Sequence, residues 1–273
     1  PEGIYLKISF STLGCPGWTW TEIVTMAKDF GYDGIEVRGI RNELYVPKAE
    51  PFLSQNIKNT KARLESLGIE IPCITSACNL SDKANIDACI EEGKEYIELA
   101  SKLGVPFIRT LGDPNPHPEE NIDFNFTVKN LSILADYAKD TNVKVLIETN
   151  GAYAGSQRML NLMETVNSKY VGVLWDVHHP YRFYNEPISQ TYNTLKDYIG
   201  FIHIKDSIIM KDSVKYKMMG YGDIPVKETL LLLKDKFYSG YVSLEWVKRW
   251  NMDLEEPGVV FSHYINYVKN VLG

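Results

Sequence analysis

Four acidic or histidine side chains lie near the ends of four short apolar segments in the second half of this sequence. They are Glu148 in VKVLIET (143–149), Asp176 in YVGVLWD (170–176), His203 in GFIHIKD (200–206) and Glu245 in YVSLEW (241–246). If these segments lie side by side, three carboxylates and one imidazole converge, and the like charges repel one another. A divalent cation would remove that repulsion. Oxygen-rich ligation with one histidine favours Mn²⁺, with Mg²⁺, Co²⁺ or Zn²⁺ as alternatives. A polar, hydrated pocket without metal is the competing interpretation.

These four segments belong to a series of eight that we expect to be strands. The other four are LKISFST (6–12), DGIEVR (33–38), EIPCITS (70–76) and PFIRTL (106–111). All eight are nearly continuously apolar and rich in Val, Ile, Phe and Tyr. This composition is typical of strands that are buried on both faces of a parallel sheet.

Amphipathic stretches with helical spacing alternate with the strands. They are WTEIVTMAKDFG (20–31), IEEGKEYIELASKLG (90–104), FTVKNLSILADYAKD (126–140), SQRMLNLMETV (156–166), ISQTYNTLKDY (188–198), VKETLLLLKDKF (226–237) and SHYINYVKNVL (262–272). The alternation predicts an α/β fold, a single (β/α)8 TIM barrel that occupies residues 1–273. A doubly wound open sheet is the main alternative. However, no glycine-rich phosphate turn follows the first strand, so nothing indicates a dinucleotide site.

In a (β/α)8 barrel the active site lies at the carboxyl ends of the strands. Because side chains alternate along a strand, three pairs of polar residues share a face and can point into the barrel together. These pairs are Glu36 with Arg38, His203 with Lys205, and Ser243 with Glu245.

Further side chains at the strand ends are candidates for substrate binding. Arg38 and Arg109 could hold a carboxylate or phosphate with two parallel hydrogen bonds, or could form an internal ion pair with Glu36. Lys205 could contact substrate or pair with Glu36 or Asp176.

Aromatic side chains near the strand ends are candidates for the pocket wall. Trp18 follows the first strand and could stack on a sugar, and Tyr153 follows Glu148 in the NGAY loop. His178 is interpreted as a loop histidine.

Five segments, DGIEVR, LIETN, WDVHH, HIKD and SLEW, resemble the signature segments of the xylose-isomerase-like TIM barrels. This sugar phosphate isomerase/epimerase family includes ketose 3-epimerases, inosose dehydratase, 3-dehydroshikimate dehydratase and endonuclease IV. The resemblance extends over nearly the whole chain, and it implies that Glu148, Asp176, His203 and Glu245 bind one divalent metal. It further implies that His179, in the Asp-x-x-His motif, either supports the metal ligands or contacts substrate, and that the two glutamates act as an acid/base pair.

The sequence departs from two branches of this family. The endonuclease relatives carry additional histidines on early strands and an Asp-x-His after the seventh strand, where this chain has GYGDIP (220–225). The ketose 3-epimerases usually carry an arginine six residues after the seventh-strand histidine, where this chain has Ile209. The HIKD form also occurs in the dehydratase relatives.

Three functions follow as hypotheses. The first is a metal-dependent isomerase or epimerase of a sugar or sugar phosphate, which removes the proton α to a carbonyl and forms a metal-stabilised enediolate. The second is a dehydratase (a lyase) of a keto-polyol such as an inosose, which would use the same metal and bases. The third, a sugar-binding barrel without turnover, is least favoured because binding alone does not require two bases.

The bulk properties limit the partners. The composition is 44% hydrophobic and 23% charged, with a net charge of −6, which argues against nucleic-acid binding. No apolar run approaches the roughly 20 residues of a membrane span, and the first residues do not resemble a signal peptide. Four cysteines without CxxC spacing are expected to be reduced thiols. The expectation is a cytoplasmic enzyme with a small-molecule substrate and no membrane association, and assembly into a homo-oligomer is left open.

Overall fold

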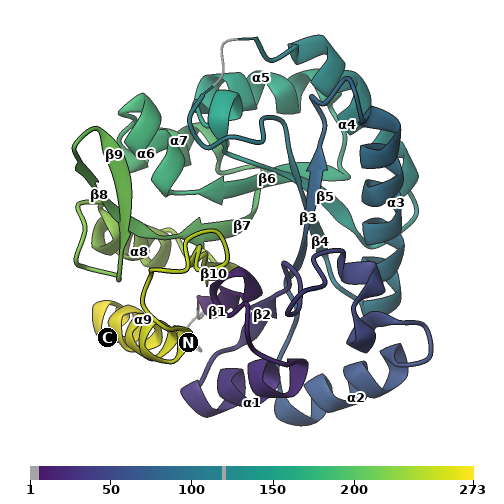
Figure 1. The fold of residues 1–273 in the computed structure, drawn as a ribbon. Coiled ribbons are helices and arrows are strands. Elements are labelled where there is room, and N and C mark those ends of the chain that lie inside the picture. Colours follow the sequence, from purple (N-terminus) through teal and green to yellow (C-terminus); the bar gives the residue numbers. More distant parts are fainter. Residues whose placement is uncertain (1–5, 119–120) are drawn as a thin grey trace.

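Eight parallel strands form a barrel surrounded by helices in the computed structural model, which describes residues 6–118 and 121–273 (Figure 1). The barrel strands are β1 (Lys7–Ser11), β2 (Gly34–Glu36), β3 (Cys73–Asn79), β4 (Phe107–Leu111), β5 (Lys144–Glu148), β6 (Val171–Asp176), β7 (Ile199–Ile204) and β10 (Tyr241–Leu244). They are hydrogen-bonded in the order β2-β1-β10-β7-β6-β5-β4-β3. Two isolated parallel bridges, Gly34–Glu70 and Val37–Ile74, join β2 to the chain at β3. The predicted (β/α)8 barrel is confirmed.

The helices lie on the outside of the barrel. They are α1 (Trp20–Phe30), α2 (Ile57–Leu67), α3 (Ile86–Leu103), α4 (Phe124–Ala138), α5 (Ser156–Val166), α6 (His178–Tyr184), α7 (Ile188–Leu195), α8 (Val226–Asp235) and α9 (Pro257–Leu272). Local sequence signals fix the ends of the first of them. The Thr19 side chain accepts a hydrogen bond from Glu22 N, and the Glu22 carboxylate accepts one from Thr19 N, which forms a capping box. Gly31 ends α1 at φ 85°, a left-handed conformation that glycine adopts without strain.

The lower layer of the barrel interior is apolar. It consists of Cys73, Leu146, Leu174, Phe201 and Tyr241, with Phe107 packed against them. Leu146 fits there because its neighbours on β6 and β7 are glycines. A Cβ atom added to Gly172 would lie 2.9 Å from Leu146 Cδ2, and one added to Gly200 would lie 3.1 Å from the same atom.

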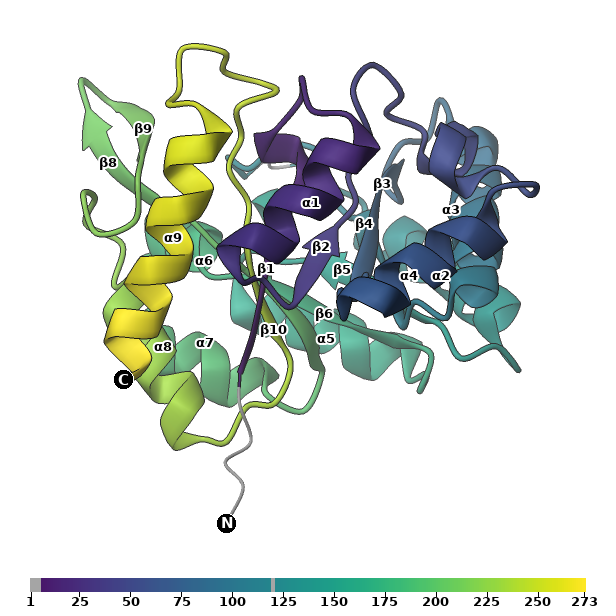
Figure 2. The same ribbon diagram turned by 90° about the horizontal axis from the view of Figure 1, so that it is seen from below.

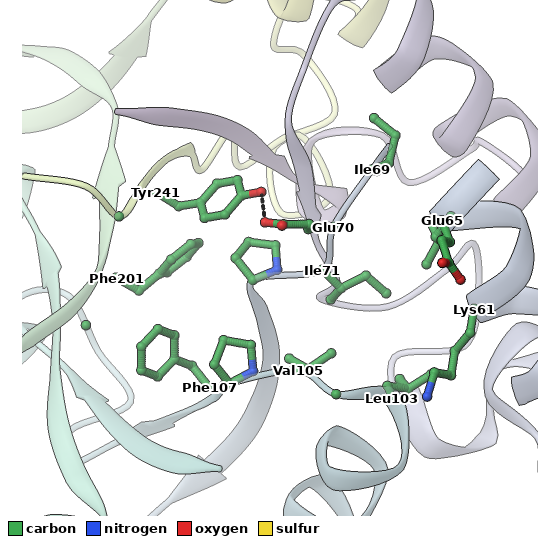
Figure 3. Close-up of a pocket in the computed structure, with 16 residues that line it drawn as sticks. Lys61, Glu65, Ile69, Glu70, Ile71, Leu103, Val105, Phe107, Phe201 and Tyr241 are labelled. Atoms are coloured by element: carbon green, nitrogen blue, oxygen red, sulfur yellow. Dashed lines mark hydrogen bonds between the residues drawn. The ribbon is translucent and has the colours of Figure 1, made fainter. Parts of the chain in front are cut away.

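A cavity of about 550 Å³ opens at the amino ends of the strands. Figure 3 shows that its walls are mostly apolar side chains, among them Phe107 and Phe201. The polar side chains between its strands are paired: Tyr241 Oη donates to Glu70 Oε2 at 2.6 Å, and Lys7 Nζ lies 2.9 Å from the same oxygen. This end of the barrel therefore contributes packing, without a converging set of unpaired polar atoms.

An antiparallel hairpin follows the seventh barrel strand, and the sequence analysis did not predict it. Its strands are β8 (Asp206–Met210) and β9 (Ser213–Lys217). In Figure 2 the hairpin and the loop between β10 and α9 both extend at the upper end of the molecule, beyond the carboxyl end of β1. Both segments therefore stand around the end of the barrel where the four predicted ligands lie.

Two helices were also not predicted. α2 buries only Thr60 and Leu64, so its amphipathic pattern is weak. α6 is seven residues long and begins directly at the two histidines after β6. Within the described part of the chain, no helix combines the length and apolar character needed to cross a membrane.

Candidate metal centre

The structure brings the four predicted ligands together at the carboxyl ends of neighbouring strands. Glu148 ends β5, Asp176 ends β6, His203 lies near the end of β7, and Glu245 directly follows β10. All four are buried, and one potential ligand atom from each lies within 4.8 Å of the others. His203 Nδ1 is 2.8 Å from Glu148 Oε1, 3.1 Å from Glu245 Oε2 and 3.6 Å from Asp176 Oδ2. Three carboxylates thus face a single imidazole nitrogen.

Glu36 fixes the orientation of the His203 ring. His203 Nε2 lies 2.7 Å from Glu36 Oε2 and 2.9 Å from Glu36 Oε1. The same carboxylate accepts hydrogen bonds from Thr75 Oγ1 at 2.5 Å and Ser243 Oγ at 2.9 Å. Because a carboxylate only accepts, Nε2 of His203 carries a proton. In the neutral form of the ring, the Nδ1 lone pair is then directed at the three carboxylates. The alternation of side chains along the strand predicted Glu36 on the inner face, but it did not predict this contact.

The residues at this position fit a divalent cation. His203 Nδ1 and Glu148 Oε1 are buried, and within the described residues neither forms a hydrogen bond, although they lie 2.8 Å apart. A lone pair facing carboxylate oxygens is repulsive unless a positive charge stands between them. Burial alone would lower the pKa of His203, but Glu36 and Glu245 raise it well above its ordinary value. A divalent cation bound between these groups would compensate the negative charge of the carboxylates in the same way. Its ligands would be carboxylate oxygens and one imidazole nitrogen.

Lys205 supplies a second positive charge beside the cluster. Its ammonium group contacts Asp176 Oδ2 and lies 2.5 Å from Glu245 Oε1. Of the two partners predicted for Lys205, Asp176 is the one that it contacts. Glu36 does not pair with Lys205, because its carboxylate contacts His203, Thr75 and Ser243. Burial would lower the pKa of Lys205, but Asp176 and Glu245 raise it well above its ordinary value. Burial would likewise raise the pKa of Glu245, but Lys205 and His203 lower it to about 2, so Glu245 is a carboxylate at neutral pH.

The histidine pair after β6 is buried against this cluster. His179 Nε2 lies 3.5 Å from Asp176 Oδ2, and His179 Nδ1 lies 3.0 Å from His178 Nδ1. The other ring nitrogen of His178 lies 2.8 Å from Ser207 Oγ. The interpretation of His178 as a loop histidine is wrong, because it stands at the start of α6, is fully buried and contacts His179. Burial lowers the pKa of His179 below its ordinary value, which favours the neutral ring.

A cavity of about 450 Å³ opens above the cluster. Its walls include six of the predicted site residues, which are Arg38, Arg109, Glu148, His179, Lys205 and Glu245. The remaining wall includes side chains that the sequence analysis did not identify, namely Val214 and Tyr216 from β9 and Trp250 and Asn251 from the loop after β10. The apolar side chains Val214 and Tyr216 alternate with polar ones in SVKYK (213–217), and this strand pattern could have identified Tyr216 as lying on the inner face of a hairpin.

The two arginines in this cavity differ in their contacts. Arg109 donates from Nη2 to Ser76 O at 2.6 Å, and its Nη1 lies 3.4 Å from Glu148 Oε2. The predicted alternative, an ion pair of Arg38 or Arg109 with Glu36, does not form. Arg38 lies over the ring of Trp250, with its guanidinium carbon 5.9 Å from the ring centroid.

Two predicted substrate contacts lie away from the cavity. Trp18 packs edge-on against Phe261 at a centroid distance of 5.6 Å, and it belongs to the core between the barrel and α9. Tyr153 is fully buried, with the Arg158 guanidinium 5.0 Å above its ring. Neither residue lines the cavity, because each follows its strand into a turn that packs outward against helices.

Comparison with known proteins agrees with this geometry. The family description "Xylose isomerase-like TIM barrel" matches residues 24–262. Fructoselysine 3-epimerase of Shigella flexneri is 24% identical over 244 residues, which cover 85% of each chain. Among solved structures, the probable 3-DHS dehydratase of Bacillus anthracis has a TM-score of 0.80 at 18% identity and covers 97% of this chain and 99% of its own. The IOLI protein with a bound zinc atom has a TM-score of 0.77 at 19% identity, covering 97% and 98%.

Proposed function

The chain belongs to the xylose isomerase-like TIM barrel family, and we propose that it is a metal-dependent epimerase or isomerase of a small sugar. The reaction is proton removal from the carbon α to a carbonyl, followed by proton return. One observation carries this proposal: two buried glutamates of one ligand cluster, Glu148 and Glu245, come from different strands and both line the same cavity. The similarity to a 3-epimerase points to the same class of reaction.

The proposed metal ligands are Glu148, Asp176, His203 and Glu245. A divalent ion held there, with Mn²⁺ as our first choice, would act as a Lewis acid and stabilise negative charge on the oxygens of the substrate. The chemistry of the donor set also accepts Mg²⁺, Co²⁺ or Zn²⁺.

The protein's own groups would move the proton. Glu245 is ionised at neutral pH because Lys205 and His203 lower its pKa, so it can accept a proton from the substrate. Glu148 comes from β5, and β6 and β7 separate it from β10 in the sheet. The two carboxylates therefore approach a bound molecule from different sides. Removal by one glutamate and return by the other would invert the configuration at that carbon.

Neighbouring side chains would bind and orient the substrate. His179 is neutral and lines the cavity, so one of its ring nitrogens can share a hydrogen bond with a hydroxyl group. Lys205 lies between Asp176 and Glu245 and can donate to a substrate oxygen. Val214 and Tyr216 of the hairpin cover the cavity from one side and would exclude water.

A dehydratase is the second candidate, and the position of Lys205 favours it. An ammonium group beside Glu245 could protonate a departing hydroxyl while the carboxylate removes the α-proton, so that water is released. The position six residues after His203 is Ile209, which lies on the exposed side of the hairpin and is 56% accessible. This is the position of the arginine that the ketose 3-epimerases usually carry, and in this chain its side chain does not line the cavity. The mass of the product separates the two candidates, because epimerisation conserves mass and dehydration loses one water.

Deuterium exchange in single glutamine variants tests the two-base assignment. The Mn²⁺-loaded Glu148→Gln and Glu245→Gln proteins are incubated in D₂O with each of the two 3-epimers of a ketose that the wild-type protein interconverts. Each variant should fail to interconvert the epimers, yet exchange the α-proton of one of them, and the two variants should exchange opposite epimers. Metal content is checked in each variant. Exchange of both epimers by both variants would rule out the assignment.

A further inference from the structure

Arg38 is a buried cation without a partner in the described chain. Its side chain is 9% exposed and lines the cavity above the ligand cluster. It makes no side-chain hydrogen bond or ion pair with any residue of 6–118 and 121–273; its one specific contact is the ring of Trp250. Within these residues, no guanidinium nitrogen of Arg38 is among the fully buried atoms that lack a hydrogen-bond partner, so the charged group opens onto the cavity. A guanidinium in that position can bind a ligand of opposite charge.

The acidic groups near Arg38 are already engaged. Glu36 accepts hydrogen bonds from His203, Thr75 and Ser243. Glu245 acts on Arg38 electrostatically, but its carboxylate lies 2.5 Å from Lys205 Nζ. Glu92 has the larger effect, and its carboxylate accepts a hydrogen bond from Ala77 N at 3.0 Å. It forms no ion pair with Arg38.

The remaining charges of the site would balance without Arg38. Four buried carboxylates, Glu36, Glu148, Asp176 and Glu245, would be offset by the proposed divalent cation together with Lys205 and Arg109. Arg109 also has its own partners in Ser76 and Glu148. Burial and repulsion from Arg109 lower the pKa of Arg38 to about 10, which is still high enough for a full positive charge at neutral pH. Arg38 therefore has no ion-pair partner among the described residues at the cavity, although Glu92 acts on it electrostatically.

The Arg38 charge stands on the side of the barrel away from the ligand cluster. The four ligands come from β5, β6, β7 and the end of β10, which are consecutive in the sheet. Arg38 follows β2, and β1 lies between β2 and β10. A molecule that spans the cavity would therefore have its reacting carbons at the ligand cluster and its far end at Arg38.

We propose that Arg38 binds an anionic group on the substrate, so that the substrate is an acidic sugar, with a phosphate or a carboxylate at the end remote from the reacting carbons. A guanidinium binds both groups through two parallel hydrogen bonds. The guanidinium carbon lies over the Trp250 ring, 5.9 Å from its centroid, a contact that helps to position the group. The position of the reacting carbons in this inference rests on the proposed function.

Three ketohexoses that differ only at carbon 6 test this proposal: D-fructose, D-fructose 6-phosphate and D-fructuronate. Their binding to the Mn²⁺-loaded protein is measured by calorimetry, and Mn²⁺ affinity is measured on the same samples. One or both anionic sugars should bind roughly 10- to 100-fold more tightly than fructose. Arg38→Met should abolish this preference, and Arg38→Lys should retain part of it because the charge remains.

Arg63→Met is the matched control, since Arg63 is exposed on α2 and its loss changes the net charge equally. It should retain the full preference. Tighter binding of the phosphate alone identifies a phosphate site, and tighter binding of the uronate alone identifies a carboxylate site. Equal affinity for all three sugars, no measurable binding of either anion, or an unchanged preference in Arg38→Met would overturn the proposal. Absence of Mn²⁺ binding with the anion preference intact would instead contradict the proposed function and leave the anion site standing.

Discussion

The two ends of the barrel each hold a cavity, but within the residues that the structure describes the buried polar atoms are paired at one end and lack hydrogen-bond partners at the other. At the amino ends of the strands, Tyr241 and Lys7 both contact Glu70, and the remaining walls are mostly apolar. At the carboxyl ends, His203 Nδ1 and Glu148 Oε1 are buried without a hydrogen-bond partner in the described chain. The amino-end cavity is the larger, at about 550 Å³ against about 450 Å³. Size therefore does not locate the site; unsatisfied, converging charge does.

The largest effect that we expect from this difference concerns His179. Replacing His179 with Ala should reduce turnover by roughly 10²- to 10⁴-fold, the usual contribution of a positioned acid/base or hydrogen-bonding histidine. The affinity for Mn²⁺ should stay within a few-fold, because His179 lies 3.5 Å from Asp176 and outside the four-residue cluster. Steady-state kinetics and metal calorimetry measure both quantities. A loss of Mn²⁺ affinity as large as that of Asp176→Ala would instead make His179 a ligand.

The opposite end should show the reverse behaviour. Leu146→Ala removes a fully buried side chain from the lower layer, so the free energy of unfolding should fall by about 2–5 kcal/mol. Mn²⁺ affinity should remain nearly unchanged. Chemical denaturation checks the first expectation and calorimetry the second. Leu231→Ala is the matched control, because Leu231 is 42% exposed and its removal should cost less than roughly 0.5 kcal/mol. A large loss of metal affinity in Leu146→Ala would break the proposed separation between the ends.

The same substitution at both ends sharpens the comparison further. Glu36→Gln weakens the hold on the His203 ring and should reduce Mn²⁺ affinity by roughly 10- to 100-fold. Glu70→Gln makes the same chemical change beside Tyr241 and Lys7 and should leave Mn²⁺ affinity unaffected. Titration of both variants with Mn²⁺ decides the point. Equal affinities would mean that Glu36 serves packing alone.

The smallest effect concerns Trp250. Trp250→Ala removes the ring beneath Arg38 and should weaken binding of the preferred anionic sugar by about 2- to 5-fold, the range of an exposed cation–π contact. Phe237→Ala is the control, because Phe237 is a more exposed aromatic (74% against 59% for Trp250) that follows α8 and does not line the cavity, and it should have no effect. The ligand affinities come from the calorimetric assay used for Arg38. An unchanged affinity in Trp250→Ala would show that Arg38 is held by other means.

The sequence was sufficient for the barrel and for the convergence of Glu148, Asp176, His203 and Glu245. Both follow from periodicity, since buried parallel strands are continuously apolar and their carboxyl ends meet at one edge. Any inward residue at those ends must therefore be a neighbour of the others.

The missing parts lacked such a signal. The turn of the β8–β9 hairpin uses Lys211 and Asp212 at φ 50° and 62°, without the Asn-Gly pair that usually marks this conformation. Tyr216 was therefore not placed at the cavity. The positions of Trp18 and Tyr153 depended on the path of short turns after the strands, which the alternation of side chains does not determine. Arg38 forms no ion pair with Glu36 because the Glu36 carboxylate already accepts hydrogen bonds from three other side chains. Only the three-dimensional arrangement reveals these contacts.

Calorimetric titration of the chelator-treated protein with Mn²⁺ tests the central claim most directly. The wild-type chain should bind one ion, and His203→Ala and Asp176→Ala should each reduce the affinity by at least about 100-fold, because each removes a ligand from a site of four. Glu70→Gln should bind as the wild type does. Activity should disappear with the metal and return when it is restored. A wild-type protein that binds no divalent ion at micromolar concentrations, or that remains fully active after chelation, would contradict the account.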